Sequence, residues 1–133
     1  MSVAVVNSGG ANISSVLHAL HRLGAEPEFT DDAATIRSAD RVILPGVGAA
    51  GRAMEVLGEH GLVHTLRELT QPVLGICLGM QLLFDSSEED NAQLLGIIPG
   101  RLRKLEETAE LRVPHMGWNS IISQKADSLS DRL

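Results

Sequence analysis

The residues best suited to chemistry surround one cysteine, Cys77, in the segment Gly75-Ile76-Cys77-Leu78-Gly79. An apolar run at 72–76 precedes the thiol and a short amphipathic run at 80–84 follows it, which predicts a strand, a sharp turn and a helix. This G-x-C-x-G pattern is the cysteine form of a nucleophile elbow. A thiol at the start of a helix is favoured as the thiolate, which is the nucleophile. The alternative is a buried, inert free cysteine.

A thiolate that attacks a carbonyl group needs backbone N–H groups to stabilise the negative charge that develops on oxygen. The residue after an elbow nucleophile supplies one of them, which here is Leu78. The loop 45–48, Pro-Gly-Val-Gly, follows an apolar strand and suits the second, because glycines let the backbone approach a ligand closely. Taken alone, this loop is better interpreted as an ordinary turn between a strand and a helix, and the presence of Cys77 at the same edge of the sheet reverses that interpretation.

A general base for the thiol is harder to find. Histidine is the usual partner of such a nucleophile. We expect four of the histidines to be solvated residues of helices or turns: His18, His21, His60 and His64. His115, beside Pro114 near the end of an expected strand, is the local candidate. A different cysteine hydrolase with His115 as its base is therefore one alternative function.

Other chemistries find little support. One cysteine and scattered histidines give no pair of ligands at a recognised metal spacing, so we expect neither a metal nor a cofactor. The run 88–90 is acidic and is interpreted as a solvated loop. The glycine-rich turn at 8–12 precedes a helix and could hold a phosphate, but it lacks the Walker lysine and the full dinucleotide pattern.

The elements that must position these residues alternate along the chain. Apolar runs predict strands at 3–6, 28–30, 41–44 and 73–76, and helical spacing predicts helices at 13–23, 32–36, 49–57 and 62–69. Continuous apolar strands between amphipathic helices indicate a parallel sheet covered on both faces, an α/β fold of the flavodoxin type. The loops at 8–10, 45–48 and 77 then share the carboxyl edge of the sheet.

The last third of the chain is more polar. The segment 85–91 is expected to be a surface loop, and 101–105 alternates as an exposed antiparallel strand does, with 111–114 as its expected partner. A polar tail ends at Leu133. With four parallel strands and one antiparallel excursion, the predicted sheet looks unfinished, although the length suggests one domain over 1–133.

Composition excludes several classes of function. The net charge of −6 argues against a surface for nucleic acid or anionic membranes. No apolar run is long enough to span a bilayer, and the N-terminus lacks the order of a signal peptide. A single cysteine fits a reducing compartment, so we expect a cytoplasmic protein.

Three segments together resemble a known family, and they occur in the order 42–48 (VILPGVG), 75–81 (GICLGMQ) and 114–119 (PHMGWN). They resemble the class I glutamine amidotransferases. Within that class they look most like the glutaminase subunits of imidazole glycerol phosphate synthases, which serve histidine biosynthesis. The cysteine elbow is shared by the whole class, whereas the other two segments point to these subunits. The resemblance covers essentially the whole chain.

The resemblance implies a role for each matched residue. Cys77 would attack the side-chain amide of glutamine and release ammonia, and Val47 and Leu78 would offer the oxyanion amides. Three residues would line the glutamine pocket: Gly46, Gly48 and Gln81. Three would lie on the face that docks a separate cyclase subunit as a heterodimer: Asn12, Met116 and Trp118. Ammonia would pass through this partner to a nucleotide intermediate, with imidazole glycerol phosphate and AICAR as the products.

One departure from the family pattern affects the base. Members of the family carry a His-Pro-Glu segment near their C-terminus, whose His and Glu complete the catalytic triad, and these 133 residues contain no such segment. We therefore expect a C-terminally truncated chain with negligible glutaminase turnover, an uncovered apolar surface and an exposed sheet edge. The alternative function is an inactive module that still docks the cyclase.

Overall fold

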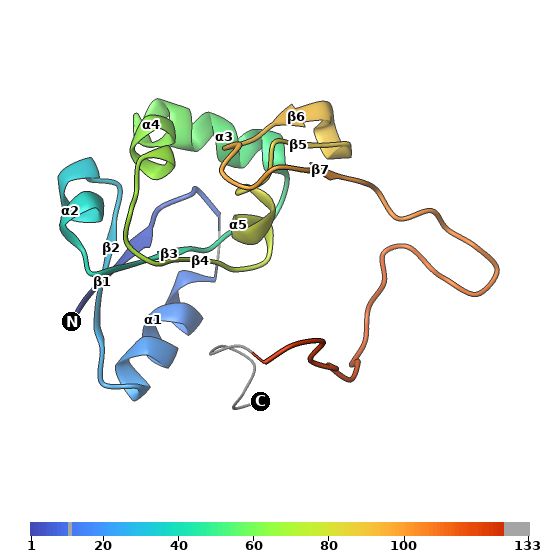
Figure 1. Cartoon of the computed structure of the whole chain (residues 1–133), viewed down its shortest axis with the longest axis horizontal. Coiled ribbons are helices and arrows are strands. Elements are labelled where there is room, and N and C mark those ends of the chain that lie inside the picture. The colour runs from blue at the N-terminus through green and yellow to red at the C-terminus, as the bar shows by residue number, and fades with distance from the viewer. Residues whose placement is uncertain (11, 127–133) are drawn as a thin grey trace.

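The structure is a computed structural model that describes residues 1–10 and 12–126. Its centre is a parallel sheet in the strand order β2-β1-β3-β4 (Figure 1). The strands are β1 (Ser2–Val6), β2 (Glu26–Thr30), β3 (Arg41–Leu44) and β4 (Val73–Gly75). This order is the beginning of the flavodoxin-like arrangement, so the predicted fold class is confirmed. Pro27 lies within β2, where it is tolerated because β2 is an edge strand.

Helices cover the sheet unequally. They are α1 (Ile13–Arg22), α2 (Ala33–Ser38), α3 (Ala50–Glu59), α4 (Leu62–Arg67) and α5 (Leu78–Gln81). Val3 and Val5 of β1 face α1, whereas Ala4 and Val6 pack in the larger core formed with the other helices. Figure 1 shows α1 on one side of the sheet and α2, α3 and α4 on the other. Because β1 is buried on both faces after the exposed Ser2, its remaining residues, 3–6, are all apolar.

Two helices begin where the sequence predicts them. The side chain of Asn12 accepts a hydrogen bond from Ser15 N at 3.4 Å, and that of Asp32 accepts one from Thr35 N at 2.7 Å. The hydrogen bonds from Thr35 hold the pKa of the Asp32 carboxyl below its ordinary value. Gly24, at φ 74°, follows α1 in the left-handed conformation expected of a helix-ending glycine.

A second, smaller sheet corrects two predictions. It has the order β6-β5-β7 and consists of β5 (Ser86–Ser87), β6 (Ala92–Gln93) and β7 (Arg101–Leu102), with the turn η1 (Glu89–Asn91) between β5 and β6. The expected surface loop at 85–91 therefore contains a strand. The expected antiparallel strand at 101–105 is reduced to β7, which pairs in parallel with β5.

The predicted pairing of 101–105 with 111–114 is also wrong. Thr108 and Leu111 close a tight turn on each other, with Thr108 N donating to Leu111 O and Leu111 N to Thr108 Oγ1, both at 3.0 Å. These local bonds take the polar groups that a ladder would need. From 103 to 126 the described chain forms no helix or strand and runs away from the two sheets as an arm (Figure 1).

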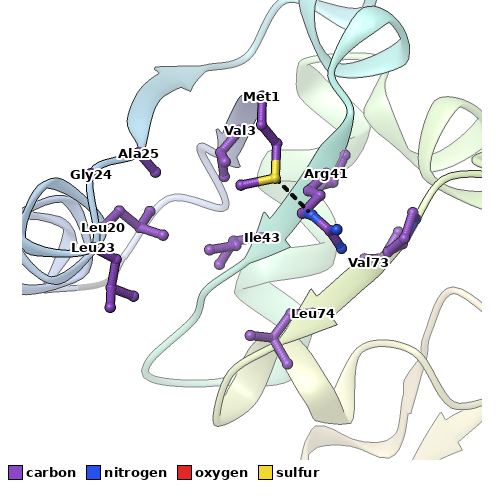
Figure 2. A pocket seen from close by; sticks show the side chains of 12 residues that line it. Met1, Val3, Leu20, Leu23, Gly24, Ala25, Arg41, Ile43, Val73 and Leu74 are labelled. Atoms are coloured by element: carbon purple, nitrogen blue, oxygen red, sulfur yellow. Dashed lines mark hydrogen bonds between the residues drawn. The ribbon is translucent and has the colours of Figure 1, made fainter. Parts of the chain in front are cut away.

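An apolar groove of about 600 Å³ lies on the α1 face of the sheet. Figure 2 shows Leu20 of α1 and Leu23, which follows that helix, on one side of the groove and Leu74 of β4 on the other. Arg41 donates from Nε to Met1 Sδ at 3.0 Å. Within the described residues β4 pairs only with β3, and the Leu74 side chain is 46% exposed. The expected uncovered apolar surface is therefore present here. No described helix has the length and hydropathy to cross a membrane.

Candidate active site

Cys77 occupies the apex of a sharp turn between β4 and α5. Its backbone has φ 55° and ψ −119°, a conformation that residues other than glycine rarely adopt. Gly79 N donates to Ile76 O at 2.9 Å and Met80 N to Cys77 O at 3.0 Å, which closes the turn. The thiol is exposed. The geometry is that of the predicted nucleophile elbow rather than of a buried thiol.

The two glycines of the elbow are explained by close packing. A Cβ at Gly75 would lie 2.5 Å from Met80 Cα, and one at Gly79 would overlap Leu44 O and lie 2.6 Å from Leu44 C. Real Cβ atoms do not approach backbone atoms so closely, so strand, turn and helix can meet only where these side chains are absent. The G-x-C-x-G spacing is therefore a packing requirement of the edge where β3 and β4 end.

The loop 45–48 lies against the elbow, as its position after β3 predicts. A Cβ at Gly46 would be 3.0 Å from Gly79 N and 3.1 Å from Leu78 Cβ. The loop therefore touches the first turn of α5, directly beside the residue that would offer an oxyanion amide. Gly48, at φ 90°, lets the backbone turn away again before α3 begins.

The two expected oxyanion amides are in different states. Among the backbone hydrogen bonds of the described residues, none is donated by Leu78, so no protein carbonyl occupies its N–H. Val47 N instead donates to Gly10 O at 2.8 Å. In this conformation the Val47 N–H is used in an intramolecular hydrogen bond, and it can donate to a substrate oxygen only after that bond opens. Its role as an oxyanion donor stays a prediction.

The loop after β1 completes the cluster of three loops at this edge. Ser8 Oγ donates to Pro45 O at 2.6 Å in a buried position. Together with the Val47–Gly10 bond, this joins the first loop to the second, which itself packs on the elbow. The predicted meeting of the three glycine-rich loops is confirmed. Asn12, an exposed residue, lies just beyond the first loop at the start of α1.

A hollow of about 630 Å³ opens beside α5. Among the described residues its lining includes Gln81, four residues after Cys77, but not Cys77 itself. Its charged lining residues are Glu88, Glu89, Asp90, Arg103 and Lys104. Glu88 is held in place, since Lys104 N donates to its Oε2 at 3.0 Å and Arg103 Nε lies 3.8 Å from its Oε1.

The acidic run at 88–90 was missed as a site by reasoning from sequence, which assigns it to a solvated loop. The small sheet brings it opposite the basic residues of 101–104, so both signs of charge line one hollow. Acidic residues at 88–90 matched by basic ones at 101–104 are the sequence signal for this pairing. These charges predict that the two segments face each other only once the pairing of β5 with β7 is known.

The described histidine contacts do not involve Cys77. His60 Nδ1 lies 3.8 Å from Asp31 Oδ2, and His64 Nε2 lies 3.2 Å from Glu68 Oε1. His115 Nε2 is 2.9 Å from Asn119 Nδ2 and lines the same hollow as Gln81. No group of three or more His, Cys, Asp or Glu side chains in the described ranges could hold a metal ion.

Comparison with known proteins identifies the family to which this arrangement is similar. The family model described as glutamine amidotransferase class-I matches residues 4–133. The chain is 51% identical over 127 residues to the imidazole glycerol phosphate synthase subunit HisH of Xylella fastidiosa (strain Temecula1). It is 50% identical over 127 residues to the subunit of the same name from Xanthomonas axonopodis pv. citri (strain 306). Each match covers 96% of this chain and 64% of the relative, so the chain spans less than two thirds of the length of these curated relatives.

A solved structure supports the fold. The chain matches one described as the crystal structure of glutamine amidotransferase, with a TM-score of 0.65 and 23% sequence identity. The match covers 76% of this chain and 55% of the other. At this identity the likeness concerns the arrangement of strands and helices and not the chemistry.

Proposed function

The chain belongs to the class I glutamine amidotransferases, and from this membership we propose that it provides the glutaminase part of an imidazole glycerol phosphate synthase in histidine biosynthesis. The observation that carries the proposal is Cys77, exposed at the apex of a strained elbow, with the Leu78 N–H, which donates to no described backbone carbonyl, directly after it in the chain. This pairing of a nucleophile with an oxyanion donor suits acyl transfer from an amide.

The proposed reaction has two steps. The Cys77 thiol gives its proton to the catalytic base, and the thiolate attacks the side-chain amide carbon of glutamine, so that the carbonyl oxygen becomes an oxyanion near Leu78 N–H. The base then passes this proton to the amide nitrogen, and ammonia leaves as the C–N bond breaks. A water molecule then attacks the resulting thioester, which releases glutamate and restores the thiol. Val47 would supply a second donor to the oxyanion in both steps, once its N–H leaves Gly10 O.

The hollow beside α5 supports an amino acid as substrate. Free glutamine carries an ammonium and a carboxylate on its α-carbon, and the lining offers carboxylates at Glu89 and Asp90 and cations at Arg103 and Lys104. We propose that Gln81 stands between this charged hollow and the elbow, and that Gly46 and Gly48 form the wall opposite α5. Cys77 would then face the side-chain amide while the hollow holds the α-carbon.

The partner in the proposal is a cyclase subunit. The relatives are described as subunits of a synthase, so each of them works in an assembly. Asn12 is exposed, Met116 is 86% exposed, and the Trp118 side chain is fully exposed on the arm. Large apolar side chains at such exposure suit an interface better than open solvent. We propose that these three residues dock the cyclase in a cytoplasmic heterodimer that receives the ammonia and makes imidazole glycerol phosphate and AICAR.

No residue of the site described above is assigned as the catalytic base. The family resemblance assigns it to a His-Pro-Glu segment, and none occurs among these 133 residues. Since triad members act as a unit, we propose that a polypeptide of these residues alone turns over glutamine negligibly. The exposed Met116 and Trp118 favour a second candidate function for it, an inactive module that docks the cyclase.

An electrophilic glutamine analogue that alkylates thiols tests the proposal. With the cyclase present, we expect mass spectrometry to find the label on Cys77 and excess glutamine to prevent it. Cys77→Ser is the matched control and should take no label. Absence of the label from Cys77 would contradict the glutaminase function. Binding of the cyclase without labelling would favour the docking module, and Met116→Ala with Trp118→Ala should weaken that binding.

A further inference from the structure

The buried hydroxyl of Ser8 has a contact that the proposed function leaves unexplained. Ser8 is 4% exposed, and its Oγ donates to Pro45 O at 2.6 Å across 37 positions of sequence. Pro45 is itself fully buried. A buried carbonyl needs a hydrogen-bond partner, and Ser8 is the partner that the structure supplies. The contact joins the end of β1 to the start of the loop that follows β3.

A second bond between the same two loops lies two residues further along. Val47 N donates to Gly10 O at 2.8 Å. Gly46 therefore lies between two held groups, the Pro45 carbonyl before it and the Val47 amide after it. Proline has a fixed φ and no N–H, so the backbone at Pro45 has little freedom of its own.

Packing on the elbow restricts the same stretch from the opposite direction. A Cβ at Gly46 would lie 3.0 Å from Gly79 N, so the backbone there is in close contact with α5. Movement of Pro45 toward or away from α5 would change the distance between Val47 and the Leu78 N–H. The Ser8 hydroxyl, in the loop after β1, opposes this movement because it is hydrogen-bonded to the carbonyl of Pro45.

We propose that Ser8 is a positioning residue for the loop 45–48: its hydroxyl anchors Pro45 and thereby keeps the Val47 amide in its bond to Gly10 O. The proposal rests on the proposed function for its catalytic meaning, although the anchor itself is a property of the fold. Ser8 touches no reacting atom. It acts through Pro45 and, beyond it, through the Val47–Gly10 bond.

Amide hydrogen exchange on the 133-residue chain tests the anchor without any glutamine chemistry. In Ser8→Ala we expect the protection of the Val47 amide to fall about tenfold, roughly the worth of one net hydrogen bond, while the protection of Val5 and Ile43 in the sheet stays unchanged. Ser8→Thr keeps the hydroxyl and should restore the protection. Ser38→Ala, which removes an exposed hydroxyl bonded to Thr35 O, is the matched control and should leave Val47 unaffected.

Labelling kinetics then separate the anchor from the function. With the cyclase and the glutamine-analogue electrophile, Ser8→Ala should raise the maximal labelling rate of Cys77 about tenfold at an unchanged half-saturating concentration, because the Val47 N–H then leaves Gly10 O more readily and can reach the oxyanion, while iodoacetamide reacts at the wild-type rate. Unchanged Val47 protection in Ser8→Ala, equal loss in Ser8→Thr, or an unchanged or slower maximal labelling rate would overturn the proposal. A wild-type chain that takes no label would refute the proposed function instead and leave the exchange result to decide the anchor.

Discussion

Replacing Cys77 by glycine should stabilise the chain relative to replacing it by alanine. Both changes remove the thiol, so they differ only in what the backbone tolerates at φ 55° and ψ −119°. At an ordinary position the preference runs the other way, because glycine loses more conformational freedom on folding than alanine does. The sign of the difference therefore reports whether the elbow is strained.

The magnitude follows from two opposing contributions. A residue other than glycine held at such backbone angles lowers the stability of the fold by about 1–3 kcal/mol. Glycine instead lowers it by about 0.5–1 kcal/mol relative to alanine, because glycine loses more backbone entropy on folding. The glycine variant should therefore unfold with a free energy about 1 kcal/mol larger than that of the alanine variant. With a urea slope of about 1–2 kcal/mol per molar, this difference moves the midpoint by about 0.5–1 M.

Urea unfolding followed by far-ultraviolet circular dichroism measures this difference, with equal slopes required for the comparison. Gly58 is the matched control: it lies inside α3, is exposed and has no atom within 4 Å of the position of a Cβ. Gly58→Ala should therefore stabilise the chain by about 0.5–1 kcal/mol. An alanine variant at Cys77 that is as stable as the glycine variant would refute the strain, and with it the argument for a nucleophile elbow.

Three further changes test other parts of the structure. Gly79→Ala should destabilise by at least about 3 kcal/mol or prevent folding, because the new Cβ would overlap Leu44 O; a loss under about 0.5 kcal/mol in denaturant would contradict the packing. Arg67→Leu should cost about 2 kcal/mol in the same assay, since Arg67 Nε donates to Leu95 O at 2.7 Å and Nη2 to Leu94 O at 3.4 Å; an unchanged midpoint would show that these carbonyls find other partners. Asp32→Asn keeps the cap of α2 but removes its charge. Because the folded pKa of Asp32 is lowered, the charge contributes stability above its unfolded value near 3.8, and this contribution is lost as the pH falls through the folded value. The wild type should therefore be the more stable protein at pH 7 and lose that advantage toward pH 2, and a gap that does not change with pH would contradict the assignment.

Much of the fold was predictable because it depends on local patterns. Continuous apolar runs correctly predict β1 and β3, and the caps at Asn12 and Asp32 are where the sequence suggests. Boundaries were less accurate: α3 continues to Glu59, past the expected end at Leu57, because Gly58 is tolerated within an exposed helical turn. The prediction of an antiparallel strand at 101–105 is wrong because the alternation of its residues does not identify the strand it pairs with. Its actual partner, β5, is two residues long and has no recognisable pattern in the sequence.

The elbow was predictable from the sequence because the spacing of Gly75, Cys77 and Gly79 is a local pattern, although the contact that excludes a side chain at Gly79 is with Leu44 of β3. The sequence also predicted that three loops meet at one edge, because parallel strands carry their following loops to the same side. The tertiary structure alone decided which way the Val47 amide points and what holds Pro45, because the partners, Gly10 and Ser8, lie 37 residues earlier in the chain. No local pattern encodes a hydrogen bond over that separation. It exists only because β1 and β3 are neighbours, and it decides whether the second oxyanion amide is free.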